Sequence, residues 1–419
     1  MKDLTPFIQT WRYGLHRALT RHSILYRVAD QCRGPQTFTY RIALADPADL
    51  ARVLTLSEQF ALVMSVRSVR VARVRGYVDV EIALPRALHR ALPAKRLPRR
   101  GGTWVALGQT TTGTPVHVDL AGNRSCHALV CGQTGSGKTV TEQLITWTLA
   151  QDNDPNAVCL ILIDGKGGSS WWGFDHAAHL AHPVISEPHE AMAALGWCLA
   201  ELDRRKADRR RTPRVFIVID EIRELLDLAG DPVTQAVQRI TSLGRDLGIH
   251  LIAATQHPLV DAVGGSFAKA NFVLRLTGAV VNAQAAYVAT GVRNSGAEQL
   301  QGNGDFLLSA AGQLHRLQVG LVGNYEFGLL PRAEHTPRLD LDNLDLDRVL
   351  DVTPISPRAD DLEPDHVAVA LASNRGINWL QGELGIGGTK ATRVREFALA
   401  IRAKLHELGY GIQPLPQSV

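Results

Sequence analysis

One glycine-rich stretch constrains this chain more than any other part of its sequence: Gly132, Gln133, Thr134, Gly135, Ser136, Gly137, Lys138 and Thr139. It fits the pattern G-x-x-x-x-G-K-[ST], the phosphate-binding P-loop. Apolar residues 127–131 precede it, and residues 141–150 repeat apolar positions at helical spacing, so the context is strand, glycine turn and helix. Glycines let the backbone wrap around phosphates at a helix N-terminus, where negative charge is favoured. We therefore expect a nucleotide site here rather than an accidental glycine loop.

Two side chains of this stretch have particular roles in the expected site. Lys138 is placed to neutralise charge on the β and γ phosphates, and the Thr139 hydroxyl to complete the shell of a Mg²⁺ ion. ATP and Mg²⁺ are accordingly the expected cofactors.

Two later strands end in polar side chains. The apolar run 215–219 is followed by Asp220 and Glu221, which has the form of a Walker B element. There Asp220 would support Mg²⁺ and Glu221 would activate the attacking water. The run 249–255 is followed by Gln256, which would lie at the ligand-facing edge of a doubly wound sheet, near the γ-phosphate. The alternatives are acids that only begin a helix and a polar residue that only begins a loop.

Composition sets broad limits. The 419 residues suggest two or three domains, and a formal net charge of +4 alone does not argue for nucleic acid. Basic clusters at 67–75, 95–100 and 204–214 are by themselves typical of solvated faces. The five cysteines have no metal-binding spacing. No signal peptide or bilayer-length apolar run is evident, so we expect a cytoplasmic protein without an integral membrane segment.

The chain is expected to have five parts: a helical arm (1–36), an α+β domain (37–100), an α/β nucleotide-binding domain (101–330), an acidic Pro-rich linker (331–364) and a C-terminal DNA-binding domain (365–419). In the α+β domain we predict strands over 38–44, 69–75 and 77–84 and one helix over 47–65. In the α/β domain we predict a further strand over 271–276, a helix over 283–290 and a terminal hairpin.

The C-terminal part suggests a helix-turn-helix. Two helices flank a glycine-bearing turn at residues 385–388, and the second carries Lys390, Arg393 and Arg395 near its start. These side chains would reach phosphates or base edges of DNA. A generic three-helix bundle is the alternative.

Several separated motifs together resemble the FtsK/SpoIIIE double-stranded DNA translocases. The resemblance rests on the P-loop block and on these blocks: 162–168, 218–222, 243–258, 269–271, Arg275 and 296–305. The segments GIHLIAATQHP and GAEQL…GNGD are more specific than the P-loop. The region before the nucleotide-binding domain resembles the alpha domain of that family, and the C-terminal part resembles its winged-helix gamma domain.

The resemblance implies a RecA-like P-loop NTPase core that assembles as a hexameric ring around duplex DNA. It assigns nucleotide binding to residues 132–139, metal binding to Thr139 and Asp220, the base to Glu221 and the γ-phosphate sensor to Gln256. An arginine finger is also implied. Ala289 stands where the family often has that arginine, so Arg275 and Arg293 are the candidates.

The function expected from the sequence is an ATP-driven translocase of double-stranded DNA, an ATPase acting in plasmid or integrative-element transfer or in chromosome segregation. The main alternative is a sequence-specific DNA-binding regulator that uses ATP to control assembly and does not translocate. A metabolic kinase is disfavoured because it would leave the C-terminal part unexplained.

Overall fold

The computed structural model describes residues 4–74, 76–122, 125–165, 169–256, 270–310, 312–333 and 339. The chain divides into two units, 1–350 and 351–419, and every described residue belongs to the first. The predicted C-terminal domain, with Lys390, Arg393 and Arg395, therefore lies outside the described residues, as does nearly all of the predicted linker.

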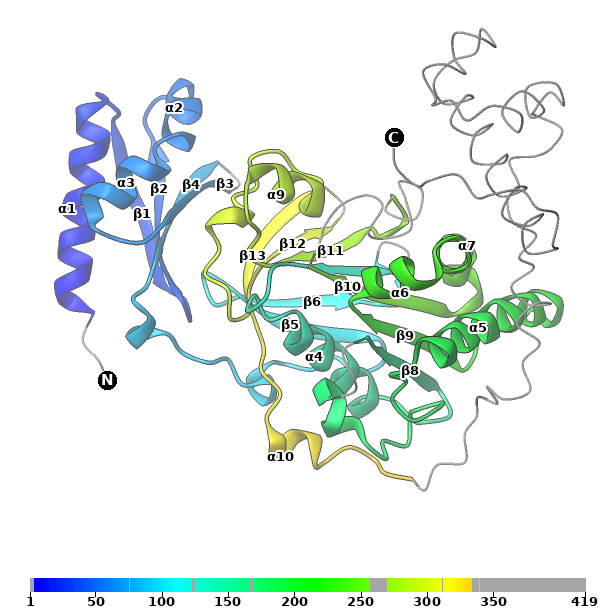
Figure 1. The fold of residues 1–419 in the computed structure, drawn as a ribbon. Helices are drawn as coiled ribbons and strands as arrows, with labels where there is room; N and C mark the ends of the chain where they lie inside the picture. Colours follow the sequence, from blue (N-terminus) through cyan, green and yellow to red (C-terminus); the bar gives the residue numbers. More distant parts are fainter. Residues whose placement is uncertain are drawn as a thin grey trace, which may run out of the picture. The chain divides into compact units, whose positions relative to one another are not determined.

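The N-terminal part is a four-stranded antiparallel sheet covered by helices (Figure 1). Its strand order is β1-β2-β4-β3. Trp11, Tyr40 and Phe60 are almost completely buried between helices and sheet. In chain order the elements are α1 (Thr5–Arg21), β1 (Tyr26–Arg33), β2 (Thr37–Leu44), α2 (Leu50–Leu54), α3 (Ser57–Met64), β3 (Val69–Val74) and β4 (Tyr77–Ala83).

Two details of this part differ from the sequence-based expectation. Residue 37 does not begin a separate domain, because β1 pairs with β2 from Tyr26↔Leu44 to Arg33↔Phe38 and α1 packs in the same core. The single helix predicted over 47–65 is broken after Leu54 into α2 and α3. The break lets Val53 and Phe60, one on each side of it, both become completely buried.

The second part is a nine-stranded mixed sheet with the order β6-β5-β13-β12-β11-β7-β10-β9-β8. The strands β11, β7, β10, β9 and β8 are parallel, and the remaining four extend the sheet as antiparallel hairpins. Its strands are β5 (Trp104–Thr110), β6 (Pro115–Asp119), β7 (Ala128–Cys131), β8 (Val158–Asp164), β9 (Arg214–Asp220), β10 (Ile249–Thr255), β11 (Leu274–Thr277), β12 (Asp305–Ala310) and β13 (Gln313–Val319).

Helices cover both faces of this sheet, which confirms the α/β class (Figure 1). They are α4 (Lys138–Gln151), α5 (Pro188–Asp208), α6 (Ile222–Ala229), α7 (Asp231–Leu247), α9 (Ala283–Thr290) and α10 (Asn324–Phe327). Alternate residues of each buried strand enter different cores: Leu160 and Leu162 belong to the α4 side, Ile161 and Ile163 to the α5–α7 side. This explains the unbroken apolar runs, since parallel strands are buried on both faces.

Helix α9 has the predicted bounds, whereas the strand predicted over 271–276 is shorter and begins at Leu274. Among the described helices, none is both long and apolar enough to cross a bilayer.

Candidate nucleotide-binding site

The P-loop lies where β7 ends at Cys131 and α4 begins at Lys138. Two of its glycines have backbone angles that only glycine adopts without strain, with φ of +81° at Gly135 and +102° at Gly137. The loop therefore closes at the N-terminus of a 14-residue helix, where free backbone N–H groups favour an anion.

A second turn, residues 302–304, packs against the P-loop and donates backbone hydrogen bonds to it. Asn303 N donates to Gly135 O at 2.9 Å, and Gly304 N donates to Ser136 O at 2.8 Å. A Cβ at Gly137 would lie 2.9 Å from Gly304 N, so this close approach requires glycine. The sequence showed the glycines of this turn only as part of a family block. Their contact with the P-loop depends on how β12 pairs in the sheet.

Lys138, Thr139 and Asp220 come together at the carboxyl ends of β7 and β9. Lys138 Nζ donates to Gly132 O at 2.8 Å, and Thr139 Oγ1 donates to Asp220 Oδ2 at 3.3 Å. Asp220 is fully buried. A hydroxyl and a carboxylate are the oxygen ligands that Mg²⁺ prefers, and it usually completes its shell with water and phosphate oxygens.

Glu221 and Gln256 form the other side of the site. Glu221 Oε1 accepts from Thr255 Oγ1 at 2.9 Å, and Glu221 Oε2 accepts from Gln256 N at 3.1 Å. Gln256 Oε1 in turn accepts from Thr134 Oγ1 at 2.7 Å. Gln256 thus connects the P-loop to the acidic residue.

A cavity of about 890 Å³ opens onto the P-loop. Its walls include Lys138, Thr139 and Gln256, and also three basic side chains that sequence reasoning missed: Arg86, His89 and Arg90. Asp220 and Glu221 do not line it; they are buried behind Thr139 and Gln256. The basic side chains suit a cavity that receives the negative charge of a triphosphate.

The three missed residues lie on a connector, defined here as residues 84–97, between the N-terminal sheet and β5. Backbone hydrogen bonds fix it on both sides: Arg90 N donates to Pro35 O at 3.0 Å, and Ala94 N donates to Leu321 O at 2.8 Å. Its place over the P-loop follows from these long-range pairings, and no local sequence signal indicates it.

Neither candidate for the arginine finger lines this cavity. Arg275 is half-buried, its Nε donates to Phe272 O at 3.1 Å, and burial lowers its pKa from the ordinary value. Arg293 is exposed and lies over the Tyr287 ring, 5.5 Å from its centroid.

These features define a class. A glycine loop between strand and helix, acids at the end of a neighbouring parallel strand and a covered α/β sheet are those of a P-loop ATPase. Family models narrow it: residues 5–86 match the FtsK alpha domain and residues 88–212 match the FtsK/SpoIIIE family. The chain belongs to the FtsK/SpoIIIE family.

Individual relatives agree with this assignment. DNA translocase SftA of Bacillus subtilis is 28% identical over 357 residues, which is 78% of this chain and 37% of that protein. DNA translocase FtsK of Staphylococcus aureus is 31% identical over 319 residues, 68% of this chain and 40% of that protein. The chain thus spans well under two thirds of the length of these curated relatives.

Among solved structures, one described as "pCW3 conjugation coupling protein TcpA monomer form with ATPgS" has the same fold. It is 19% identical with a TM-score of 0.51, over 75% of this chain and 96% of that one.

Proposed function

We propose that this chain is the motor of a double-stranded DNA translocase driven by ATP hydrolysis, working as a ring of RecA-like subunits. The observation that carries the proposal is the position of Glu221. Its carboxylate accepts hydrogen bonds from Thr255 and Gln256, and the Gln256 side chain in turn contacts Thr134 of the P-loop, which supports Glu221 as the base for water attack. The names of the FtsK and SftA relatives support duplex DNA as the substrate.

Each residue of the site has a role in this proposal. Lys138 and the P-loop amides would bind the phosphates, and Thr139 and Asp220 would hold Mg²⁺, which would supply positive charge against the phosphate oxygens. Glu221 orients the attacking water and accepts its proton. Loss of the γ-phosphate then changes what Gln256 contacts, and the Gln256–Thr134 hydrogen bond passes that change to the P-loop.

The test is ATP hydrolysis with and without duplex DNA, in the wild type and in Lys138→Ala. The wild type should hydrolyse ATP faster with duplex, and the variant should have lost both activities. Equal rates in the two proteins would remove the proposal.

The alternative, an ATP-controlled DNA-binding regulator, makes a different prediction. A regulator needs no base for hydrolysis, whereas the translocase proposal assigns that role to Glu221. A triplex-displacement assay separates the two, since a translocase strips the third strand from a duplex when supplied with ATP and a regulator leaves it bound. Whether the motor serves DNA transfer or chromosome segregation stays an expectation from the sequence.

A further inference from the structure

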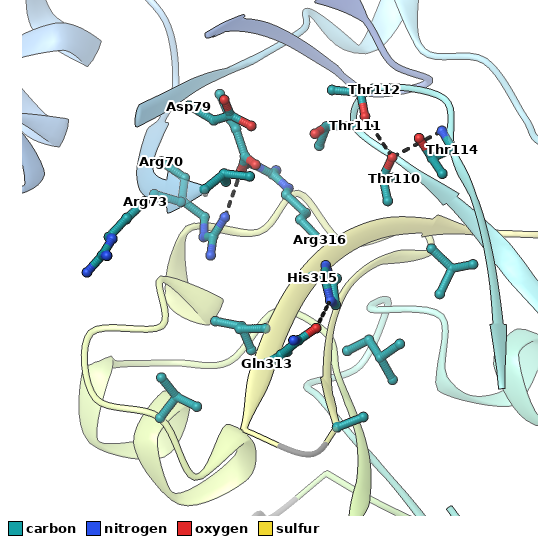
Figure 2. Close-up of a pocket in the computed structure, with 18 of the residues that line it drawn as sticks. Arg70, Arg73, Asp79, Thr110, Thr111, Thr112, Thr114, Gln313, His315 and Arg316 are labelled. Carbon is teal, nitrogen blue, oxygen red and sulfur yellow. Dashed lines mark hydrogen bonds and ion pairs between the residues drawn. The ribbon is translucent and has the colours of Figure 1, made fainter. Parts of the chain in front are cut away.

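A second cavity, of about 970 Å³, lies between the N-terminal sheet and the antiparallel hairpins of the large sheet. Figure 2 shows Arg70, Arg73 and Asp79 on one side of it and Thr112 and Thr114 on the other. In all, six arginines and two carboxylates line this cleft. The excess of positive charge indicates an anionic ligand.

The arginines inside the cleft already have partners. Glu81 Oε2 accepts from Arg70 Nη1 at 3.0 Å and from Arg316 Nη1 at 2.8 Å, and Arg41 pairs with Asp79 at 2.8 Å. Burial would raise the pKa of Glu81, but the two guanidiniums outweigh it and hold that pKa below its usual value. Arg316 also pairs with Asp305 at 2.7 Å, so three guanidiniums face three carboxylates. The interior is therefore electrically matched and offers little to a small anion.

The arginines at the rim of the cleft, unlike those inside it, have no carboxylate partner among the described residues. Arg73, Arg100 and Arg293 are exposed, and no ion pair to a carboxylate is found for any of them within the described chain. Arg100 lies over the Trp104 ring, 4.9 Å from its centroid, and Arg293 lies over Tyr287. Stacking on an aromatic ring orients a guanidinium and leaves its N–H groups free to donate.

We propose that this rim binds the phosphate backbone of duplex DNA. A ligand matched to separated, exposed guanidiniums around a neutral interior is an extended polyanion, and guanidinium forks suit phosphate oxygens. Neutral donors lie at the same cleft, Thr114 and Gln313, as is typical of backbone contacts that position a protein on DNA without reading its sequence. This inference rests on the proposed function and adds to it the residues that contact the backbone.

The experiment measures duplex binding against salt concentration, by anisotropy of a labelled random-sequence duplex with a non-hydrolysable ATP analogue. Three proteins are compared with the wild type: Arg73→Gln/Arg100→Gln, its charge-retaining partner Arg73→Lys/Arg100→Lys, and the control Arg12→Gln/Arg17→Gln. The control removes the same charge from exposed positions of α1 that do not line the cleft. Hydrolysis without DNA confirms folding, because neither rim position contacts the nucleotide cavity.

Each phosphate contact contributes about 0.9 to the slope of log affinity against log salt. The glutamine variant should therefore lose about two from that slope and bind several-fold more weakly at low salt. The lysine variant should keep the slope, and the control should match the wild type.

An unchanged slope in the glutamine variant, with duplex binding intact in the wild type, would overturn this inference alone. So would tighter competition for the rim by a poly-glutamate peptide than by duplex, which would indicate an acidic protein partner. A wild type that hydrolyses ATP but binds no duplex would remove the proposed function as well.

Discussion

Glu221 has a left-handed backbone conformation, with φ of +65°, directly after the buried strand β9. A residue other than glycine occupies this region only when its surroundings enforce it, and such residues are frequent at functional sites. Here the enforcement is visible, since Glu221 accepts hydrogen bonds from Thr255 and Gln256. The strained turn therefore holds the carboxylate against the carboxyl end of β10.

Glu221→Gln should separate binding from hydrolysis. The amide keeps the size of the side chain but cannot accept a proton, so we expect the hydrolysis rate to fall by about 10²-fold or more. The Kd for ATP, measured by fluorescence of a labelled analogue, should stay within about threefold of the wild type. A rate near the wild-type value would show that another group is the base.

The basic residues of the connector should act on nucleotide binding. Arg86 and Arg90 line the same cavity as Lys138, and a charge-assisted hydrogen bond to phosphate contributes about 1.5–3 kcal/mol. Arg86→Ala/Arg90→Ala should therefore raise KM for ATP at least about tenfold and change kcat much less. The matched control is Arg96→Ala, an exposed connector residue outside the cavity. Equal KM values in variant and control would contradict the assignment.

At the scale of elements, the hairpin β12–β13 joins the N-terminal sheet to the P-loop. Arg316 of β13 binds Glu81 of β4 at 2.8 Å and Asp305 of β12 at 2.7 Å, all three side chains being buried. Asn303, in the turn before β12, contacts the P-loop and accepts from Gln36 Nε2 at 2.7 Å. Movement of the P-loop is thereby linked to the N-terminal part through hydrogen bonds.

Arg316→Met should destabilise the chain strongly. It leaves Glu81 and Asp305 buried with fewer partners, which costs about 3–5 kcal/mol at neutral pH. A carboxylate whose pKa is lowered by folding contributes stability above its unfolded pKa of about 4.3 and loses it as the pH falls. The difference in free energy of unfolding between the wild type and Arg316→Met should therefore become smaller below about pH 4.

Urea unfolding followed by tryptophan fluorescence at several pH values measures this difference. Arg239→Met is the control, because its exposed pair with Asp203 should contribute about 1 kcal/mol or less. A cost for Arg316→Met that is constant down to pH 3 would contradict the ionic explanation.

The sequence predicted those elements and residues whose position depends on a local sequence pattern. The P-loop, Asp220 and Glu221 follow apolar strands within a few residues, so spacing alone predicted where they would lie. Arg86 and Arg90 were missed because their place depends on pairings with residues far along the chain. The pairing of β1 with β2 was missed for a related reason: half of the residues in β1 are polar and none of its eight residues is buried, so the strand has little apolar periodicity.

At the scale of the whole molecule, the arginine finger remains to be placed. Neither Arg275 nor Arg293 lines the nucleotide cavity of its own chain. If either of these two arginines contributes to hydrolysis in the proposed ring, it would therefore have to reach the site of a neighbouring subunit, as fingers supplied in trans do. In a head-to-tail ring each interface joins the P-loop of one copy to a different face of the next.

Mixing two inactive variants tests this arrangement. Lys138→Ala retains the finger without a working P-loop, and Arg275→Ala retains the P-loop without the finger. In mixed rings about one interface in four joins an intact P-loop to an intact arginine, so activity should return to roughly a quarter of the wild-type rate. Mixing Arg275→Ala with Lys138→Ala/Arg275→Ala should restore nothing. The same pair of mixtures made with Arg293→Ala decides between the two arginines. Only removal of the true finger should give a variant that is inactive alone and regains activity when mixed with Lys138→Ala. Failure of both arginines to complement would contradict a site completed by either of them from a second copy.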